Sequence, residues 1–162
     1  MQTCHLVVMG VSGCGKSTLG TQLAKSLQRK FYEGDNYHSP HSVEKMKAGQ
    51  PLTDQDRIPW LKQLAQVLID SDDPAILSCS ALKYRYREIL RSCTIPLFFI
   101  HLALDRDSAY ERLIQRTDHF FEPSLLDDQF AQLEPLKPTE RGTTLRADLS
   151  PNELIHRVLQ IQ

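Results

Sequence analysis

Nine residues near the start of the sequence, Gly10 to Thr18, read GVSGCGKST. The spacing of Gly10, Gly15, Lys16 and Ser17 fits the P-loop pattern, in which successive backbone N–H groups surround a phosphate. A short apolar run precedes this stretch, and leucines follow it at helical spacing, at positions 19, 23 and 27. The stretch therefore lies where its chemistry requires it, at a turn from a strand into the N-terminus of a helix, whose dipole favours anions.

Acidic residues follow the next apolar segment, in the run EGDNYH, which contains Glu33, Asp35 and His38. Carboxylates near bound phosphates repel them unless a Mg²⁺ ion lies between, or unless a carboxylate takes the proton of an attacking hydroxyl. A solvated acidic turn is the alternative interpretation. We favour the chemical interpretation, because this turn would lie in the crevice that the first loop fills with phosphate.

A basic group follows the third apolar segment, where Lys83, Arg87 and Arg91 fall at i, i+4 and i+8 on one helix face. We interpret Arg87 and Arg91 as a solvated face. Lys83 is nearest the strand end and is a candidate for binding an anionic substrate. No Asp ends the third strand, so Ser17 and the acids at 33–35 must supply more of the coordination of any metal, partly through water.

Arg57 precedes the sequence IPWL, which contains the one tryptophan of the chain. Its guanidinium has two interpretations: a cation–π contact with Trp60, or bidentate capture of a carboxylate. Residues 116–135 are polar and interrupted by proline, so they predict a lid that closes over a nucleotide and excludes water. Arg116 begins this segment and is a candidate for stacking on adenine or contacting phosphate.

The elements that must position these side chains alternate along the chain. Apolar segments predict strands at 5–9, 30–33, 75–79, 97–102 and 143–148. Periodic patterns predict helices at 16–28, 40–48, 56–70, 82–92, 106–116, 124–133 and 151–161. This alternation predicts an α/β fold with a parallel sheet and helices on both faces, in one domain over residues 1–162. Ligands of such sheets bind beyond the carboxyl ends of the strands, which is where the candidate residues fall.

Composition excludes several classes of function. The formal charge of −1 and the absence of a basic stripe disfavour nucleic acid as a partner. No apolar run reaches the roughly 20 residues that span a bilayer, and no signal peptide is recognisable, so we expect a cytoplasmic protein without a membrane partner. Cys4, Cys14, Cys79 and Cys93 lack zinc spacing and are expected to be reduced. Cys14 lies within the phosphate loop, so either its thiolate is stabilised there or its side chain packs inertly.

Taken together, these stretches resemble the small P-loop gluconokinases, relatives of the shikimate kinases and nucleoside monophosphate kinases. The resemblance covers nearly the whole chain. It rests on MGVSGCGKST, EGDNYHSPHSVEKMKAGQPLTDQDRIPWL, CSALKYRYREILR and DHFFEPSLLDDQFAQLEPL. The P-loop alone would identify only the superfamily, and the other three stretches make the resemblance specific.

The resemblance implies a three-layer α/β/α fold with a central parallel five-stranded sheet and a helical lid at about 117–135. It implies ATP- and Mg²⁺-dependent phosphorylation of D-gluconate to 6-phospho-D-gluconate, by a homodimer. The ATP phosphates would lie on Gly10, Val11, Ser12, Gly13, Cys14, Gly15, Lys16, Ser17 and Thr18, with Ser17 on the metal and Arg116 on the nucleotide. Asp35 would face the acceptor hydroxyl and Arg57 the substrate carboxylate, with His38 and Lys83 completing the substrate site.

The chain departs from related kinases in its lid, which after Arg116 has no basic residue until Lys137. The lid therefore leaves open which cations stabilise the transferring phosphoryl group: Lys16 is expected next to it, and Lys83 and Arg116 are further candidates. The expected catalytic residues are Lys16 and Asp35. Three alternatives remain at this point: a kinase of another hydroxy acid such as shikimate, a nucleotide-dependent switch, and a kinase of nucleic-acid ends. The run CSALK argues against a shikimate kinase, for which a glycine-rich turn is expected.

Overall fold

The computed structural model describes residues 3–115 and 122–161. Within them a single sheet of five parallel strands has the order β2–β3–β1–β4–β5. The strands are β1 (His5–Met9), β2 (Phe31–Glu33), β3 (Ile76–Ser78), β4 (Leu97–Ala103) and β5 (Gly142–Arg146). The predicted α/β fold with a five-stranded parallel sheet is confirmed.

Seven α-helices connect and cover these strands in the described part of the chain. They are α1 (Lys16–Leu27), α2 (Pro40–Lys47), α3 (Asp54–Ile69), α4 (Tyr84–Leu90), α5 (Arg106–Ile114), α6 (Leu126–Gln132) and α7 (Pro151–Gln160), with 3₁₀ turns η1 (Gly34–Tyr37) and η2 (Pro123–Leu125). Each predicted helix is present, with ends shifted by a few residues. Residues 117–121 of the predicted lid lie outside the described residues, and the rest of it contains η2 and α6.

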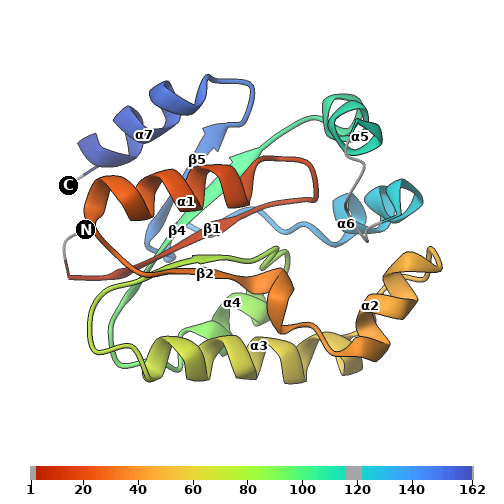
Figure 1. Ribbon diagram of the computed structural model, residues 1–162, viewed down its shortest axis with the longest axis horizontal. Helices are drawn as coiled ribbons and strands as arrows, with labels where there is room; N and C mark the ends of the chain where they lie inside the picture. Colours follow the sequence, from red (N-terminus) through yellow and green to blue (C-terminus); the bar gives the residue numbers. More distant parts are fainter. Residues whose placement is uncertain (1–2, 116–121, 162) are drawn as a thin grey trace.

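The sheet lies between two layers of helices, with α1 and α7 on one face and α3 and α4 on the other (Figure 1). Side chains of β1 alternate between them: Leu6 and Val8 pack with α1 and α7, whereas Val7 and Met9 pack with α3 and α4. Both faces of β1 are therefore buried, which explains why its sequence is an unbroken apolar run rather than an alternating one.

The carboxyl ends of the strands all point to one side of the molecule. The turn from β1 into α1, η1, α2, α5 and α6 gather at this side (Figure 1). None of the described helices has the length and apolar character needed to cross a membrane. The strand ends place the candidate residues from four separate stretches at one edge of the sheet.

Candidate active site

The phosphate loop joins β1 to α1 and has a backbone that requires glycine. Gly10 has φ of 141°, and a Cβ there would lie 2.8 Å from both Cys14 Sγ and the Leu102 carbonyl oxygen. Gly15 caps α1 with φ of 96° and supplies no side-chain bond to the first N–H groups, and the first turn contains no acid. The N–H groups at the start of α1 therefore remain available to an anion, as the P-loop pattern predicts.

The side chains of Lys16 and Gln129 make hydrogen bonds to the backbone of this loop. Lys16 Nζ donates a hydrogen bond to the Val11 carbonyl oxygen at 3.0 Å, so its ammonium lies across the mouth of the loop. The backbone N–H of Ser12 donates to Oε1 of Gln129 at 2.6 Å. Gln129 is buried on α6 and was not predicted, because nothing in its sequence context distinguishes it from a surface glutamine.

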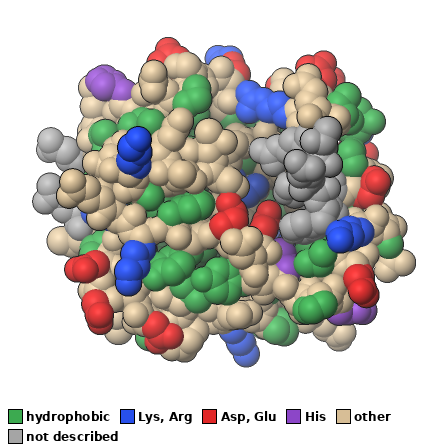
Figure 2. Space-filling view, in the orientation of Figure 1, with side chains coloured by type: hydrophobic (Ala, Val, Ile, Leu, Met, Phe, Trp, Pro, Cys, Tyr) green, Lys and Arg blue, Asp and Glu red, His purple; other side chains and the backbone are tan. Residues whose placement is uncertain are grey.

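Lys16, Asp35 and Arg57 converge on the turn after β3, although three different segments supply them. Burial raises the pKa of the Cys79 thiol to about 12; Asp35 acts in the same direction, and Lys16 and Arg57 oppose it. All three charged side chains are therefore within electrostatic range of this one thiol. The structure therefore brings together a P-loop cation, a carboxylate and a second cation. In Figure 2, acidic side chains lie beside a recessed basic one near the middle of the face shown.

Arg57 is buried on α3, with only 5% of its surface exposed. Its Nε donates to the Leu52 carbonyl oxygen at 3.3 Å. Among the described residues no carboxylate lies within 4 Å of its guanidinium, although Asp56 and Asp128 act on it from further away. Burial lowers the pKa of Arg57, because removing the guanidinium from water disfavours its charged form. A buried cation without a paired anion is costly, so this geometry favours an anionic ligand.

His38 stacks on Trp60, with ring centroids 4.1 Å apart and planes inclined by 17°. The Trp60 indole N–H donates to the Gly34 carbonyl oxygen at 2.8 Å, which ties α3 to the turn that contains Asp35. Burial lowers the pKa of His38 to about 4, despite Asp35 Oδ1 at 3.9 Å from Nε2. His38 is therefore neutral near pH 7. The ring of His38, and not the guanidinium of Arg57, stacks on Trp60.

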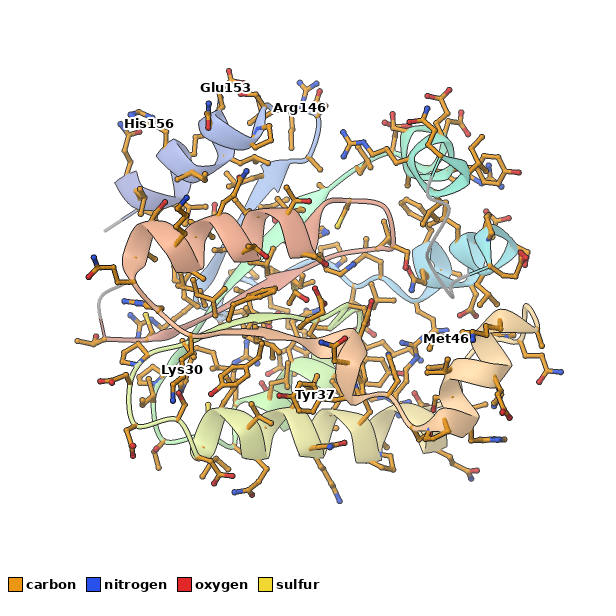
Figure 3. All side chains as sticks on the ribbon, in the orientation of Figure 1. Lys30, Tyr37, Met46, Arg146, Glu153 and His156 are labelled. Carbon is orange, nitrogen blue, oxygen red and sulfur yellow. The ribbon has the colours of Figure 1, made fainter. Side chains whose placement is uncertain are left out.

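The outer side of this pair borders a groove of about 530 Å³ between η1, the start of α2 and α3. Tyr37, which borders the groove, lies over α3 in Figure 3. His38 Nδ1 is buried and has no hydrogen-bond partner among the described residues. The ring thus has one nitrogen directed at Asp35 and a second without a partner in this part of the chain.

Lys83 lies at the N-terminus of α4, and its ammonium is already engaged. Its Nζ is 3.5 Å from Asp54 Oδ1. The Asp54 carboxylate also pairs with Arg85 and accepts a hydrogen bond from the Tyr86 hydroxyl. Lys83 therefore borders the crevice as part of an ion cluster with an acid that the sequence did not single out.

Arg87 and Arg91 do not form a solvated face, so that interpretation is wrong. Arg87 is completely buried, and its guanidinium binds the carboxylate of Glu140 through Nε at 2.7 Å and Nη2 at 2.8 Å. Arg91 reaches the same carboxylate at 2.5 Å. These residues do share one helix face, as their spacing predicted. The segment that covers this face contains Glu140, 53 residues from Arg87 in sequence.

A second pocket lies on the other side of the phosphate loop, with a volume of about 390 Å³. Its mostly apolar walls come from the loop, α1, α5 and the turn into α7. The lining residues are Gly13, Cys14, Gly15, Thr18, Leu19, Arg112, Gln115, Ala147, Leu149, Pro151 and Leu154. Arg112 Nη2 donates to the Ala147 carbonyl oxygen at 2.9 Å, which joins two walls. Arg116, the residue predicted to contact the nucleotide, lies outside the described residues.

The Cys14 side chain is buried in the core, which favours the second of its two alternatives, an inertly packed thiol, over a stabilised thiolate. It is buried among the apolar residues between the sheet and α1. Burial raises the pKa of its thiol, against weaker opposing effects of Lys16 and Arg112. The alternative of an inertly packed side chain therefore applies. Cys79 and Cys93 are also free thiols.

Comparisons with known proteins agree with this geometry. The family model for shikimate kinase matches residues 12–157. A probable gluconokinase of Mus musculus is 42% identical, over 96% of this chain and 95% of the relative. A gluconokinase of Gluconobacter oxydans is also 42% identical, over 96% of this chain and 89% of the relative.

Solved structures give the same result. A sugar kinase from Janibacter sp. HTCC2649 is 42% identical with a TM-score of 0.92, covering 97% of this chain and 92% of that one. A gluconokinase from Sinorhizobium meliloti 1021 is 39% identical with a TM-score of 0.88, covering 98% and 90%. A shikimate kinase from Aquifex aeolicus, at 16% identity and a TM-score of 0.64, shares the fold. With a phosphate loop, a converging carboxylate and these relatives over nearly its whole length, the chain belongs to the gluconokinase family, within the wider group of shikimate-kinase-like enzymes.

Proposed function

We propose that this protein transfers the γ-phosphoryl group of ATP to the primary hydroxyl of D-gluconate, forming 6-phospho-D-gluconate and ADP. The observation that carries this proposal is the buried Arg57 guanidinium, which has no paired carboxylate among the described residues. It acts on the same buried thiol, that of Cys79, as Asp35 and Lys16 do. A sugar acid supplies both the missing anion and a hydroxyl for Asp35. The gluconokinases among the relatives support the choice of acid.

The proposed roles follow from the charges at the crevice. Arg57 binds the substrate carboxylate through its guanidinium, and Asp35 accepts the proton of the attacking hydroxyl. The hydroxyl oxygen bonds to the γ-phosphorus as the bond to the ADP oxygen breaks. Lys16 counters the negative charge that develops on the transferring group. Neutral His38 and the Lys83–Asp54 pair offer hydrogen bonds to the remaining substrate hydroxyls.

ATP is the proposed phosphoryl donor, with its phosphates on the loop from Gly10 to Thr18. The pocket of about 390 Å³ beside that loop accommodates the adenosine, with Arg112 in its wall. This placement supports Arg112 as a nucleotide contact in addition to Arg116. Apolar walls with a few polar groups are typical of nucleoside pockets.

Mg²⁺ is the proposed metal, and the donor set fits it. The Ser17 hydroxyl lies in the first turn of α1, next to the proposed phosphate site, with Asp35 across the crevice. The described residues contain no cluster of three or more metal-binding side chains. Mg²⁺ in kinases takes only one or two protein ligands and completes its shell with phosphate oxygens and water, so Ser17 and a water-mediated Asp35 are sufficient. When bound, the ion neutralises charge on the phosphates.

The resemblance also supports a homodimer in the cytoplasm with gluconate as the small-molecule partner. The oligomeric state is testable by light scattering of the purified protein. A homodimer would give twice the chain mass of 18.5 kDa. A mass equal to a single chain at working concentration would contradict the dimer without affecting the proposed reaction.

ADP release over a panel of D-gluconate, other aldonates and shikimate tests the proposed reaction directly. We expect gluconate to give the highest kcat/KM.

Asp35→Asn should lower kcat with little change in ATP binding, because the hydroxyl loses its proton acceptor. Arg57→Ala should raise the gluconate KM, with Arg57→Lys intermediate because it retains charge without the bidentate fork. Weakened ATP binding alone in both variants would mean that the substrate site lies elsewhere.

A further inference from the structure

The turn between β3 and α4 has a strained backbone at one position. Ala81 has φ of 43°, in the left-handed region that residues with a Cβ rarely adopt. The turn follows the carboxyl end of β3 and leads to Lys83, at the edge of the sheet where the proposed substrate crevice lies. Strain of this kind persists only where surrounding contacts hold it.

One side of this turn is fixed by the phosphate loop and the neighbouring strand. The backbone N–H of Gly10 donates to the Ser80 carbonyl oxygen at 3.3 Å. The N–H of Cys79 donates to the Val8 carbonyl oxygen at 3.1 Å. The side of the turn next to the phosphate loop is therefore held by backbone hydrogen bonds that do not involve Arg87.

Arg87 holds the other side. Its Nη1 donates to the carbonyl oxygens of Ala81 at 3.2 Å and Leu82 at 3.0 Å, which are consecutive groups of the strained turn. Nε and Nη2 also donate to the Glu140 carboxylate, which compensates the buried positive charge. A lysine could not reproduce this arrangement, because one ammonium replaces a planar fork of five donors.

The same guanidinium also binds the segment that follows α6. Nη1 donates to the Glu134 carbonyl oxygen at 3.1 Å and Nη2 to that of Pro135 at 3.2 Å. Direct bonds reinforce this link: Glu134 N–H donates to the Leu82 carbonyl oxygen at 2.9 Å, and Tyr84 N–H donates to Glu134 Oε2 at 2.6 Å. This segment begins just after α6, whose Gln129 binds the phosphate loop.

We propose that Arg87 is a positioning residue, which holds the strained turn at 80–83 against the segment that follows α6 and so sets the shape of the substrate site. The proposal rests on the proposed function for its kinetic readout. Arg87 touches neither substrate nor nucleotide. It acts through the carbonyl groups of the turn, and it links the substrate side of the crevice to the helix that contacts the phosphate loop.

Kinetics of Arg87→Met, Arg87→Lys and Arg91→Met test this role. Arg91 is the matched control, because it binds the same Glu140 carboxylate but has no hydrogen bond to the turn among the described contacts. Both Arg87 variants should raise the gluconate KM by about tenfold, while the KM for ATP and kcat change by less than about threefold. Arg91→Met should leave the gluconate KM within about twofold of the parent value.

Ala81→Gly supplies the rescue, because glycine adopts the left-handed conformation without help. Added to Arg87→Lys, it should recover at least about a third of the lost gluconate affinity, whereas alone it should change little. If Arg87 only stabilises the fold, each Arg87 variant will lower kcat in proportion to its folded fraction, leave both KM values unchanged and show no rescue by Ala81→Gly. That pattern would overturn the proposal.

Hydrogen exchange gives a readout that does not depend on the substrate. In Arg87→Lys, the amides of Tyr84 and Glu134 should exchange faster than in the parent protein, and Arg91→Met should leave them protected. A parent protein without gluconate-dependent ADP release would refute the proposed function, while the exchange data would still decide the role of Arg87. Unchanged exchange at both amides in Arg87→Lys would refute that role by itself.

Discussion

Two buried arginines, Arg87 and Arg57, differ in whether the chain itself supplies an anion for their charge. Arg87 has the Glu140 carboxylate and four backbone carbonyl groups as partners, so its charge is fully compensated within the chain. Arg57 has one backbone carbonyl and no carboxylate within 4 Å among the described residues. Since leaving a buried charge unpaired is costly, Arg87 needs no ligand to balance its charge, whereas for Arg57 we propose an anion from outside the chain.

Lys16→Ala should abolish turnover. Its ammonium lies over the loop that would hold the β- and γ-phosphates, where it counters charge developing during transfer. The fold should survive, because the side chain makes one hydrogen bond to a local carbonyl, and circular dichroism would check this. Activity above about a tenth of the parent rate, roughly 1.4 kcal/mol of barrier, would refute the assignment.

Cys14 should react slowly with iodoacetamide. Its thiol is buried in the core and burial raises its pKa, whereas Cys93 is only partly buried. Alkylation needs the thiolate and access to it, so we expect Cys93 to label first by mass-spectrometric mapping. Mg-ATP should have no direct effect on the Cys14 thiol. Faster labelling of Cys14 than of Cys93, with protection by nucleotide, would restore the idea of a reactive loop thiol.

At the scale of elements, the N-terminus of α3 positions the proposed carboxylate clamp. Thr53 and Asp56 form a capping box, and Lys45 Nζ on α2 binds the same Asp56 carboxylate at 2.6 Å. Hydrogen bonding from Lys45 lowers the pKa of Asp56 to about 2. Arg57 follows directly, and its N–H donates to the Thr53 carbonyl oxygen at 3.0 Å. The cap therefore fixes the first helical turn on which Arg57 lies.

Thr53→Ala should lower the free energy of unfolding by about 1 kcal/mol and raise the gluconate KM by roughly threefold. Ser150→Ala is a matched control, because Ser150 forms the same kind of capping box with Glu153 on α7. Glu153 lies with α7 on the outer side of the molecule (Figure 3). We expect a similar loss of stability without a change in the gluconate KM. Equal effects of both variants on that KM would show that the cap does not position Arg57.

At the scale of the whole molecule, Glu140 joins α4 to the segment that returns to β5. Burial alone would raise the pKa of Glu140, but hydrogen bonds from Arg87, the Lys137 N–H and Arg91 outweigh it and lower the pKa to about 2. A carboxyl whose pKa is lower in the folded state stabilises the fold above its unfolded pKa. That contribution is lost as the pH falls from about 4.5 to about 2.

Glu140→Gln should therefore lower the free energy of unfolding by about 3 kcal/mol at pH 7, because it leaves Arg87 buried without its anion. Urea unfolding at a series of pH values should show this difference shrinking below pH 4.5. Asp148→Asn breaks an ion pair with the exposed Arg146 and serves as the control, with little expected change. A loss for Glu140→Gln that is independent of pH would contradict this explanation.

Local patterns were sufficient for most of the fold. Apolar runs and helical spacing predicted the strands and helices to within a few residues, because each element buries a continuous face. The P-loop spacing located the turn from β1 to α1, and the alternation of elements predicted the parallel sheet. The strand order β2–β3–β1–β4–β5 could not be obtained in this way, because the alternation of elements leaves open which strands are neighbours.

The sequence by itself determined which chemical groups follow the strands, because the carboxyl ends of parallel strands meet at one edge. Only the tertiary structure decided which of those groups are free to act. Lys83 is paired with Asp54, Arg87 is neutralised by Glu140, and Cys14 is enclosed by the core. Asp54 lies 29 residues from Lys83, and Glu140 lies 53 residues from Arg87. These partners come from elements that meet only in the folded protein, so no local pattern could assign them. Whether a buried charged side chain stabilises the fold or is available to bind a ligand depends on those long-range partners. A buried charge that is unpaired is costly, whereas one that is paired within the chain needs no ligand.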